Sequence, residues 1–577
     1  MDGTRDTDKK FCSIVFDVLR QHGVTDVVCS PGSRNAPLLI AAAARDDMKK
    51  HIVIDERCAA FMALGIATVS RKPVALVCTS GTALLNYAPA VAEAFYQGIP
   101  LIVLSADRPQ QWIDQDDAQT LRQFEALSNF VKKSYELPAW GDSDPELQWY
   151  ANRIANDAMI EATSRRNGPV HINIRLGDPL GNKIKRDYTA QRKIEILVSD
   201  SILNKEVERR LAMELLYKKV MLVVGFMPPD NHLQRSVIEM KGKPNVVVMA
   251  ETLSNLHMCK SAYSIDSVLT AYTEDELDRL APDVVISLGG SLVSRKLKEY
   301  LRRNKERCTH WALGWTHTTS DCFMSLTKRI EVNPSRFLRH IAGYMDSAIR
   351  KGAQISFGDY SRQWEEARAS TAKVKAEYVE NAPWSELSAF SKIFTSIPAS
   401  YNLFLSNGTA VRYAQILDYN LPHASYCNRG VSGIDGSCST AIGGAVAYNG
   451  ETVLITGDLS MAYDIGALTL PEIPEKMRII VIDNEGGGIF RFIPTTSSLE
   501  EREEYFCVAP KLPLHNLAEG YGWEYMEATN AIELDEALRK LISTEHKMIL
   551  RVICDGEKSA EILKSYMRIG VKINDNR

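Results

Sequence analysis

Residues 452–484 read TVLITGDLSMAYDIGALTLPEIPEKMRIIVIDN, and they contain two short β-branched runs that each end in polar residues. The first run ends in Gly457 and Asp458, and the second ends in Asn484, shortly before three consecutive glycines. Runs of this length, separated by a helical stretch, are typical of neighbouring strands in a parallel sheet. The stretch therefore predicts an α/β domain with polar side chains gathered at the carboxyl edge of its sheet.

The same alternation recurs along the chain and predicts three consecutive α/β domains. The strand candidates are residues 26–30, 51–55, 74–78, 101–107, 169–175, 219–226, 245–251, 283–290, 401–409, 452–458, 478–484 and 548–555. We expect an N-terminal domain over residues 1–185, a central domain over 190–345, a connector over 346–382 and a C-terminal domain over 383–577. The predicted fold class is α/β, with three parallel-sheet domains in series.

The composition is that of an ordinary globular protein. The 577 residues include 68 Lys and Arg against 72 Asp and Glu, which gives a formal net charge of −4. This balance excludes a broad basic surface for nucleic acid, and no apolar run approaches the ~18 residues that a membrane span needs. The amino terminus carries no apolar leader, and the eleven cysteines include no C-x-x-C pair and are interpreted as free thiols. We therefore expect a cytoplasmic protein without nucleic-acid or membrane partners.

The polar strand ends near residue 458 suit a metal that holds a diphosphate. Carboxylate, amide and backbone carbonyl oxygens are hard ligands of the kind Mg²⁺ prefers. Gly457 allows a close approach of the backbone to a ligand, and the following helix start offers N–H groups to phosphate oxygens. On these residues alone, an α/β protein with two polar strand ends by chance is an equal alternative.

The spacing from Gly457-Asp458 to Asn484 resembles the motif of thiamine diphosphate enzymes. These enzymes also need a buried carboxylate that binds N1′ of the cofactor's aminopyrimidine. Residues 51–67 read HIVIDERCAAFMALGIA and place Glu56 at a strand end, just ahead of an apolar helix. The alternative is an exposed acid paired with Arg57, but two half-motifs in the correct order favour the cofactor role.

Five longer segments make the resemblance narrower. They are SPGSRNAPL (30–38), DERCAAFMALGIA (55–67), TSGTALLNYAPAVAEAFYQGIPLIVLSADRP (79–109), NRGVSGIDG (428–436) and DNEGGGIFRFIP (483–494). Together they resemble the 2-succinyl-5-enolpyruvyl-6-hydroxy-3-cyclohexene-1-carboxylate synthase family, thiamine diphosphate enzymes of menaquinone biosynthesis. The similarity runs from the first predicted strand to the last.

The resemblance implies a reaction and an assembly. It implies that 2-oxoglutarate is decarboxylated with thiamine diphosphate and Mg²⁺ or Mn²⁺, and that the succinyl carbanion equivalent adds to isochorismate. It implies that the first domain binds the pyrimidine and the third binds the diphosphate. It also implies a homo-oligomer, a dimer or a tetramer, whose active site joins the first domain of one subunit to the third domain of another.

The resemblance further implies the residues of the site. The cations for two dicarboxylate substrates are Arg34, Arg108, Arg412 and Arg429, with Arg295 or Lys296 from the central domain. The neutral polar candidates are Ser33 and Gln119, and the apolar wall over the substrate is Ile489 and Phe490. The cofactor-binding set is Glu56, Asn407, Gly408, Ile434, Gly457, Asp458, Leu459, Ser460 and Asn484, with Ile434 bending the cofactor. The metal set is Asp458, Asn484 and the carbonyl of Gly486.

The chain departs from the family pattern at several positions. Gly408 stands where a serine is frequent, Ala118 replaces a frequent asparagine, and Asp483 occupies the first slot of a usual Asn-Asn pair. Arg295 and Lys296 occur in the reverse of the usual order. Three other interpretations stay open. They are another thiamine enzyme such as an acetolactate synthase or 2-oxo acid decarboxylase, a nucleotide-binding dehydrogenase suggested by SLGGS, and a catalytically inactive homologue.

Overall fold

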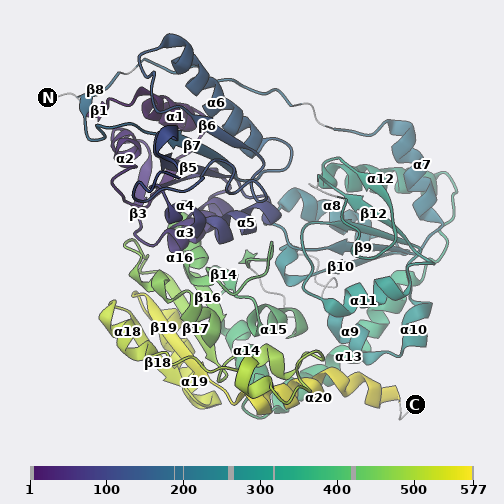
Figure 1. Cartoon of the computed structure of the whole chain (residues 1–577). Helices are drawn as coiled ribbons and strands as arrows, with labels where there is room; N and C mark the ends of the chain where they lie inside the picture. The colour runs from purple at the N-terminus through teal and green to yellow at the C-terminus, as the bar shows by residue number, and fades with distance from the viewer. Residues whose placement is uncertain are drawn as a thin grey trace.

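The structure is a computed structural model that describes residues 5–187, 189–198, 201–257, 265–315, 319–417 and 424–574. It contains three parallel sheets, each covered by helices, so the predicted class of three parallel-sheet α/β domains is confirmed (Figure 1). A short antiparallel pair, β1 (Arg5–Thr7) with β8 (Lys183–Lys185), lies outside these sheets. The residue boundaries proposed for the domains stay a prediction. No helix in the described ranges is long and apolar enough to span a membrane.

The N-terminal sheet has the order β3-β2-β4-β5-β7-β6. Its strands are β2 (Asp26–Cys29), β3 (Lys49–Ile52), β4 (Val74–Cys78), β5 (Leu101–Asp107), β6 (Ser134–Leu137) and β7 (Val170–Arg175). Its helices are α1 (Lys10–Gln21), α2 (Ala36–Ala43), α3 (Glu56–Ser70), α4 (Thr82–Asn86), α5 (Ala88–Gln97) and α6 (Pro145–Thr163). The strand predicted over 51–55 lies earlier, because the Asp55 side chain accepts a hydrogen bond from the Cys58 N–H and starts helix α3.

The central sheet has the order β10-β9-β11-β12-β13. Its strands are β9 (Val220–Val224), β10 (Val246–Ala250), β11 (Val284–Leu288), β12 (Thr309–Leu313) and β13 (Leu326–Ile330). Its helices are α7 (Lys205–Leu216), α8 (Asn231–Lys241), α9 (Ile265–Ala271), α10 (Glu274–Arg279), α11 (Arg295–Arg303) and α12 (Pro334–Arg350). The polar stretch predicted as a connector forms the long helix α13 (Tyr360–Asn381), which packs on β10 and α9.

The C-terminal sheet has the order β15-β14-β16-β17-β19-β18. Its strands are β14 (Asn402–Leu405), β15 (Ser425–Tyr426), β16 (Thr452–Gly457), β17 (Met477–Asp483), β18 (Glu524–Ala528) and β19 (Met548–Ile553). Its helices are α14 (Glu386–Ser396), α15 (Thr409–Leu417), α16 (Ser437–Ala447), α17 (Asp458–Tyr463), α18 (Leu514–Gly520), α19 (Ala531–Ser543) and α20 (Gly556–Asn574). β16 and β17 pair in parallel, so Asp458 and Asn484 follow neighbouring strands.

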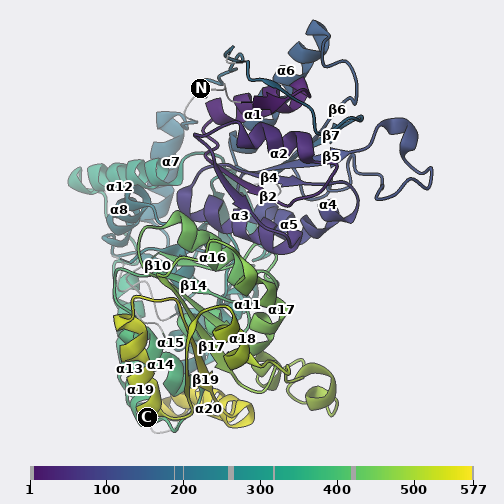
Figure 2. The same ribbon diagram turned by 90° about the vertical axis from the view of Figure 1, so that its left-hand side faces the viewer.

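The N-terminal and C-terminal domains share a core through α3 and α16, which lie directly against each other in both views (Figures 1 and 2). Small residues allow this contact. A Cβ on Gly65 would lie 1.9 Å from the Thr440 carbonyl oxygen, and one on Gly443 would lie 2.0 Å from that of Met62. Any larger residue at these glycines would force the helices apart. The helix that begins at Glu56 is therefore held rigidly on the C-terminal domain.

Candidate functional site

The carboxyl edge of the C-terminal sheet brings Asp458 close to the loop after β17. Asp458 is the first residue of α17 and is buried. Its two carboxylate oxygens accept hydrogen bonds from the Gly486 N–H at 2.7 Å and the Leu459 N–H at 2.8 Å. Gly486 has a φ of +82°, a conformation that favours glycine. A backbone hydrogen bond therefore joins two of the predicted metal-site residues, Asp458 and Gly486.

The charge of Asp458 is not balanced by a basic side chain. Burial raises the pKa of Asp458 to about 6, and the nearby negative charge of Asp483 adds to the effect. Asp483 is itself bound to Arg551, with Oδ2 2.6 Å from Nη2. Within the described ranges, no lysine or arginine forms an ion pair with Asp458. A divalent cation would favour the charged form of this carboxyl group and would supply the missing partner.

Asn484 carries an amide oxygen without a partner. The Asn484 side chain is buried, and its Nδ2 donates to Glu386 Oε1 at 2.9 Å, while its Oδ1 forms no hydrogen bond. Such a buried acceptor is costly unless a ligand satisfies it. Three or more acidic, His or Cys side chains do not gather into a metal site anywhere in the described part of the chain. A metal here would need amide and carbonyl oxygens beside Asp458, and this donor set fits Mg²⁺ or Mn²⁺.

Open space lies over two glycines of the same domain. A Cβ added to Gly457 or Gly408 would meet no atom within 4 Å, and Gly408 has a φ of +98°. Gly457 ends β16, and Gly408 lies between β14 and α15. These two positions therefore leave room for a phosphate group to approach the bare backbone.

The loop over residues 428–436 is held against this edge by Asn407 and Ser460. Asn407 Nδ2 donates to the carbonyl oxygens of Asn428 and Gly433, both at 2.7 Å. Ser460 Oγ donates to the Ile434 carbonyl oxygen at 2.6 Å. The Ile434 side chain is 37% exposed, so it is not simple core packing. These contacts present Ile434 on the surface of the domain, where a cofactor could rest against it.

Arg412 and Arg429 form a cationic pair that makes no direct ion pair with an acidic side chain, although the charge of the buried Glu251 interacts with that of Arg429. Arg429 is only 8% exposed; it donates from Nη1 to Asn407 Oδ1 at 2.9 Å, and its Nε forms no hydrogen bond. Burial and the neighbouring charge of Arg429 lower the pKa of Arg412 to about 10. Across the ranges the structure describes, neither guanidinium has an ion pair with Asp or Glu. Two partly desolvated cations of this kind attract an anionic ligand.

In the central domain a lysine outside the predicted set, Lys298, lies beside this cationic pair. Arg295 is 65% exposed in its side chain and pairs with Glu299 at 2.6 Å, and Lys296 is also exposed. Lys298 is half-buried, and its Nζ donates to the Leu292 carbonyl oxygen at 3.1 Å. Arg429 Nη2 donates to the same oxygen at 3.4 Å, which places Lys298 beside the cationic pair.

The spacing of apolar residues around Lys298 could have indicated this lysine from the sequence, although the family pattern directs attention to Arg295 and Lys296. Burial lowers the pKa of Lys298, which is consistent with a desolvated ammonium group. Positions 294, 297, 298 and 301 share one face of a helix, and Ser294, Leu297 and Leu301 are buried. A lysine in such an apolar stripe is an unusual cation, because most lysines are exposed.

The carboxyl edge of the N-terminal sheet holds Glu56 close to Cys78 and Tyr87. The Glu56 carboxylate is half-buried, and its charge adds to burial in raising the pKa of both neighbours. Arg57 does not pair with it. Instead, Arg57 Nη2 donates to the Tyr463 carbonyl oxygen at 3.0 Å, and the guanidinium lies over the Tyr463 ring. The alternative of a surface pair between Glu56 and Arg57 is therefore wrong.

The two arginines of the N-terminal edge already have partners. Arg34 is buried, with Nη1 3.1 Å from the Leu176 carbonyl oxygen and 3.6 Å from Asp178 Oδ1. Arg108 Nη1 lies 2.6 Å from Asp117 Oδ2, and its Nε donates to a carbonyl at 2.9 Å. A substrate carboxylate would have to compete with these groups.

The remaining predicted residues lie on loops or short turns. Ser33 and Gln119 are exposed, and Gln119 adopts a φ of +57° with its Cγ packed against Gly81. Ile489 and Phe490 lie on the turn η5 (Gly488–Arg491) and are half-buried. Apart from Arg295 and Lys296 on α11, the candidates thus lie in two groups, one in the N-terminal domain and one in the C-terminal domain. No hydrogen bond or ion pair between described residues joins Glu56 to Asp458 or Asn484.

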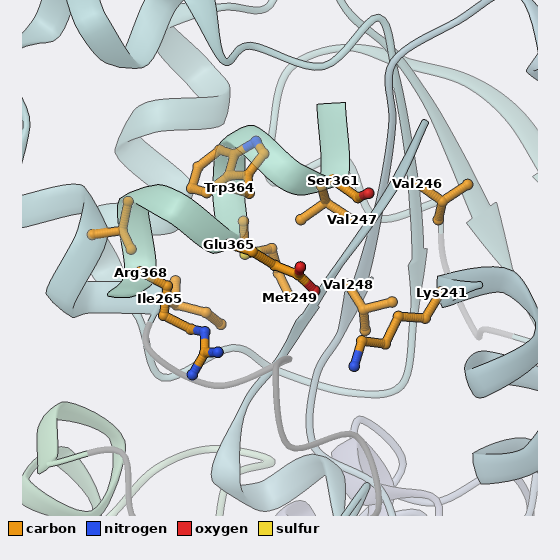
Figure 3. Close-up of a pocket in the computed structure, with 11 residues that line it drawn as sticks. Lys241, Val246, Val247, Val248, Met249, Ile265, Ser361, Trp364, Glu365 and Arg368 are labelled. Carbon is orange, nitrogen blue, oxygen red and sulfur yellow. The ribbon is translucent and has the colours of Figure 1, made fainter. Parts of the chain in front are cut away.

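A separate cavity lies in the central domain, between β10 and α13 (Figure 3). Its lining includes Val246–Met249 and Trp364, with Lys241, Glu365 and Arg368. None of the site residues predicted from the sequence lines this cavity. The cavity therefore does not belong to either group of candidates.

Two family models match this chain, one in its N-terminal part and one in its C-terminal part. Residues 9–126 match the family described as thiamine pyrophosphate enzyme, N-terminal TPP binding domain. Residues 407–552 match the family described as thiamine pyrophosphate enzyme, C-terminal TPP binding domain. These ranges contain the N-terminal and C-terminal groups of candidate residues.

Relatives that align over nearly the whole chain include proteins named 2-succinyl-5-enolpyruvyl-6-hydroxy-3-cyclohexene-1-carboxylate synthase. The protein from Porphyromonas gingivalis is 40% identical over 563 residues, which cover 97% of each chain. That from Flavobacterium psychrophilum is 37% identical over 560 residues, 96% of this chain and 98% of the relative. That from Bacteroides thetaiotaomicron is 33% identical over 564 residues, 97% of this chain and 98% of the relative.

Proposed function

We propose, because this chain belongs to the 2-succinyl-5-enolpyruvyl-6-hydroxy-3-cyclohexene-1-carboxylate synthase family of thiamine diphosphate enzymes, that it catalyses the reaction for which its relatives are named. It decarboxylates 2-oxoglutarate and adds the succinyl carbanion equivalent to isochorismate. The products are CO₂ and the cyclohexene carboxylate of that name, in menaquinone biosynthesis.

The observation that carries this choice is the pair of partly desolvated arginines, Arg412 and Arg429, which make no direct ion pair with an acidic side chain. Both substrates are dicarboxylates, and an unpaired buried carboxylate is costly, so the site needs unpaired cations. An acetolactate synthase or a 2-oxo acid decarboxylase acting on a monocarboxylate would need fewer. Lys298 adds a third cation beside the pair.

The C-terminal edge would hold the cofactor by its diphosphate. Asp458, Asn484 and the carbonyl of Gly486 would bind Mg²⁺ or Mn²⁺, and the open Gly408 and Gly457 would accept the phosphates. Asn407, Leu459 and Ser460 would shape this cradle, with Ile434 against the rings. Bound thiamine diphosphate would supply the electron sink for the negative charge left when CO₂ departs.

The N-terminal edge would supply the proton-binding group and further substrate contacts. Glu56 would hold a proton at N1′ of the aminopyrimidine, which requires a carboxyl group in a pocket with little water. Ser33 and Gln119 would donate hydrogen bonds to substrate oxygens, and Arg34 and Arg108 would bind a carboxylate by exchanging their present partners. Arg295 and Lys296, exposed on α11, would act as outer guiding charges, while Ile489 and Phe490 would exclude water.

The site would be completed by a second subunit. The cofactor needs both the Glu56 group and the Asp458 group, and each group lies on a different domain edge. Ile54, two residues before Glu56, is 83% exposed, and Leu85 is also exposed. Exposed apolar side chains of this size beside a functional group suit a subunit interface. We propose that the protein is cytoplasmic and forms a homodimer or a tetramer.

The test is an assay of the purified protein with thiamine diphosphate, Mg²⁺ and the two substrates. We expect CO₂ release with 2-oxoglutarate and a new adduct only when isochorismate is also present. Omission of Mg²⁺ is the control for the metal. Preference for pyruvate as the donor would favour the acetolactate type of enzyme, and absence of any turnover would favour an inactive homologue.

A further inference from the structure

Behind the proposed metal site lies a buried acid, Glu386, which no part of the proposed reaction uses. Glu386 is the first residue of α14 and is almost fully buried. Its backbone N–H donates to Ser559 Oγ at 3.0 Å, and the preceding Ser385 caps the helix through a capping box with Ser388. The position of Glu386 is therefore determined from both its helix and α20.

The Glu386 side chain is directed at one end of the Asn484 amide. Glu386 Oε1 accepts the hydrogen bond from Asn484 Nδ2 at 2.9 Å. Oε1 is the accepting atom of this contact, whereas the amide has a donor end and an acceptor end. The nitrogen of Asn484 must therefore face Glu386, and its oxygen faces away. That oxygen is the buried acceptor that lacks a partner.

Gly488 closes the space beside this pair. A Cβ on Gly488 would lie 2.3 Å from Asn484 Nδ2 and 3.1 Å from Glu386 Oε1. Arg491 Nη1 also donates to the Asn484 backbone carbonyl at 2.7 Å, which fixes the main chain at this residue. The amide thus has no room to move aside, and its one remaining freedom is an exchange of its two ends.

We propose that Glu386 is a positioning residue that orients the Asn484 amide with its oxygen toward the divalent ion. The proposal rests on the proposed function, because the ion belongs to the thiamine diphosphate site. Without an acceptor at position 386 the amide can turn over and present its NH₂ group to the cation. The chain then loses a metal ligand without losing Asn484. Outer groups that orient ligands in this way commonly change metal affinity by about 10- to 100-fold.

Two substitutions separate orientation from charge. Glu386→Gln keeps a carbonyl oxygen that can accept from Asn484 Nδ2 but removes the charge, and Glu386→Leu removes the acceptor while filling the volume. If Glu386 acts only by stabilising the start of α14 through its charge, both variants should lose that effect equally. Glu208→Leu, which removes another buried glutamate in the central domain, is the matched control.

The measurement is the Mn²⁺ concentration at half-saturation in the presence of excess thiamine diphosphate, followed by the EPR signal of free Mn²⁺. We expect Glu386→Leu to raise this concentration by about tenfold or more, and Glu386→Gln and Glu208→Leu to stay close to the parent protein. Asn484→Ala should weaken binding as well, and Glu386→Leu should add nothing to it, because one ligand is lost in either case.

Several results would overturn the proposal. Unchanged Mn²⁺ binding in Glu386→Leu, equal losses in the Gln and Leu variants, or additive losses with Asn484→Ala would each do so. If Glu386→Leu does not fold, Glu386→Asp takes its place, because the shorter side chain withdraws the acceptor and should raise the Mn²⁺ requirement. A parent protein that binds thiamine diphosphate independently of metal would overturn the proposed function as well, whereas the other results leave it intact.

Discussion

The two outer domains present their candidate residues in different states. At the N-terminal edge, Arg34 and Arg108 are held by a backbone carbonyl and by Asp117. At the C-terminal edge, Arg412 and Arg429 make no direct ion pair with an acidic side chain among the described residues, and the Asn484 amide oxygen has no hydrogen-bond partner. Buried polar groups are normally satisfied within the protein. The comparison teaches that the C-terminal edge leaves polar groups for an incoming ligand to satisfy. At the N-terminal edge the two arginines already have protein partners, which a substrate carboxylate would have to replace.

The largest expected effect separates activation of the cofactor from its binding. Glu56→Gln keeps the shape of the N-terminal edge but removes the proton-accepting group. Exchange of the thiazolium C2 proton of bound thiamine diphosphate should slow by about 10²- to 10⁴-fold. Hydrogen–deuterium exchange followed by NMR measures this rate, and cofactor affinity should stay nearly constant. Exchange at the parent rate would show that Glu56 has no part in activation.

The second prediction is the converse at the C-terminal edge. Asp458→Ala removes the one charged metal ligand, so Mg²⁺-dependent binding of thiamine diphosphate should weaken by about hundredfold or more. Quenching of tryptophan fluorescence on titration with cofactor measures the affinity. Circular dichroism provides the control that the fold is intact. An unchanged affinity would contradict the metal assignment.

The third prediction compares the arginines of the two edges. Arg429→Ala should reduce kcat/KM by about 10- to 100-fold, because it removes a charge-assisted hydrogen bond to a substrate carboxylate. Arg108→Ala should cost less, since Asp117 already competes for that guanidinium. Steady-state kinetics with each substrate varied in turn measures both. Equal losses in the two variants would remove the proposed difference between the edges, and unaltered cofactor affinity serves as the control.

The fourth prediction concerns the cation from the central domain. Lys298→Met should raise the KM for one dicarboxylate substrate by up to about tenfold, because the half-buried ammonium lies beside Arg429. Arg295→Met is the matched control on the same helix, and it should change KM little because its side chain is exposed and paired with Glu299. A larger change of KM in Arg295→Met than in Lys298→Met would favour Arg295, the residue that the family pattern predicts, as the substrate-binding cation.

The smallest effect is on the stability of the protein without metal or cofactor. The folded-state pKa of Asp458 is raised to about 6 from 3.8, so its contribution to stability is complete below about pH 4. That contribution is lost as the pH rises through 6. Asp458→Asn mimics the neutral acid, so its Tm relative to the parent should rise by roughly 1 °C between pH 5 and pH 8. Differential scanning calorimetry measures this, and a difference that is independent of pH would contradict it.

Local patterns predict much of the fold because they depend on neighbours in the chain. The β-branched runs of the central strands, such as 74–78 and 101–107, form β4 and β5 with the expected bounds. The strand predicted over 51–55 is displaced because Asp55, read as a strand end, caps helix α3. Side-chain capping and strand propensity compete for the same residue, and a hydrogen bond of the folded chain decides between them.

The sequence by itself determined the class of the fold and the family, and it supplied the candidate site residues, because these follow from periodicity and from motifs of contiguous residues. Only the tertiary structure decided which of the central-domain cations is partly buried beside Arg429. Arg295, Lys296 and Lys298 lie within four positions of one another, yet burial and the position of Leu292 set Lys298 apart. Only the tertiary structure placed Glu386 behind Asn484, since the two residues lie 98 positions apart in the chain. Desolvation and hydrogen-bond direction depend on segments that are distant in sequence, and no local pattern encodes them.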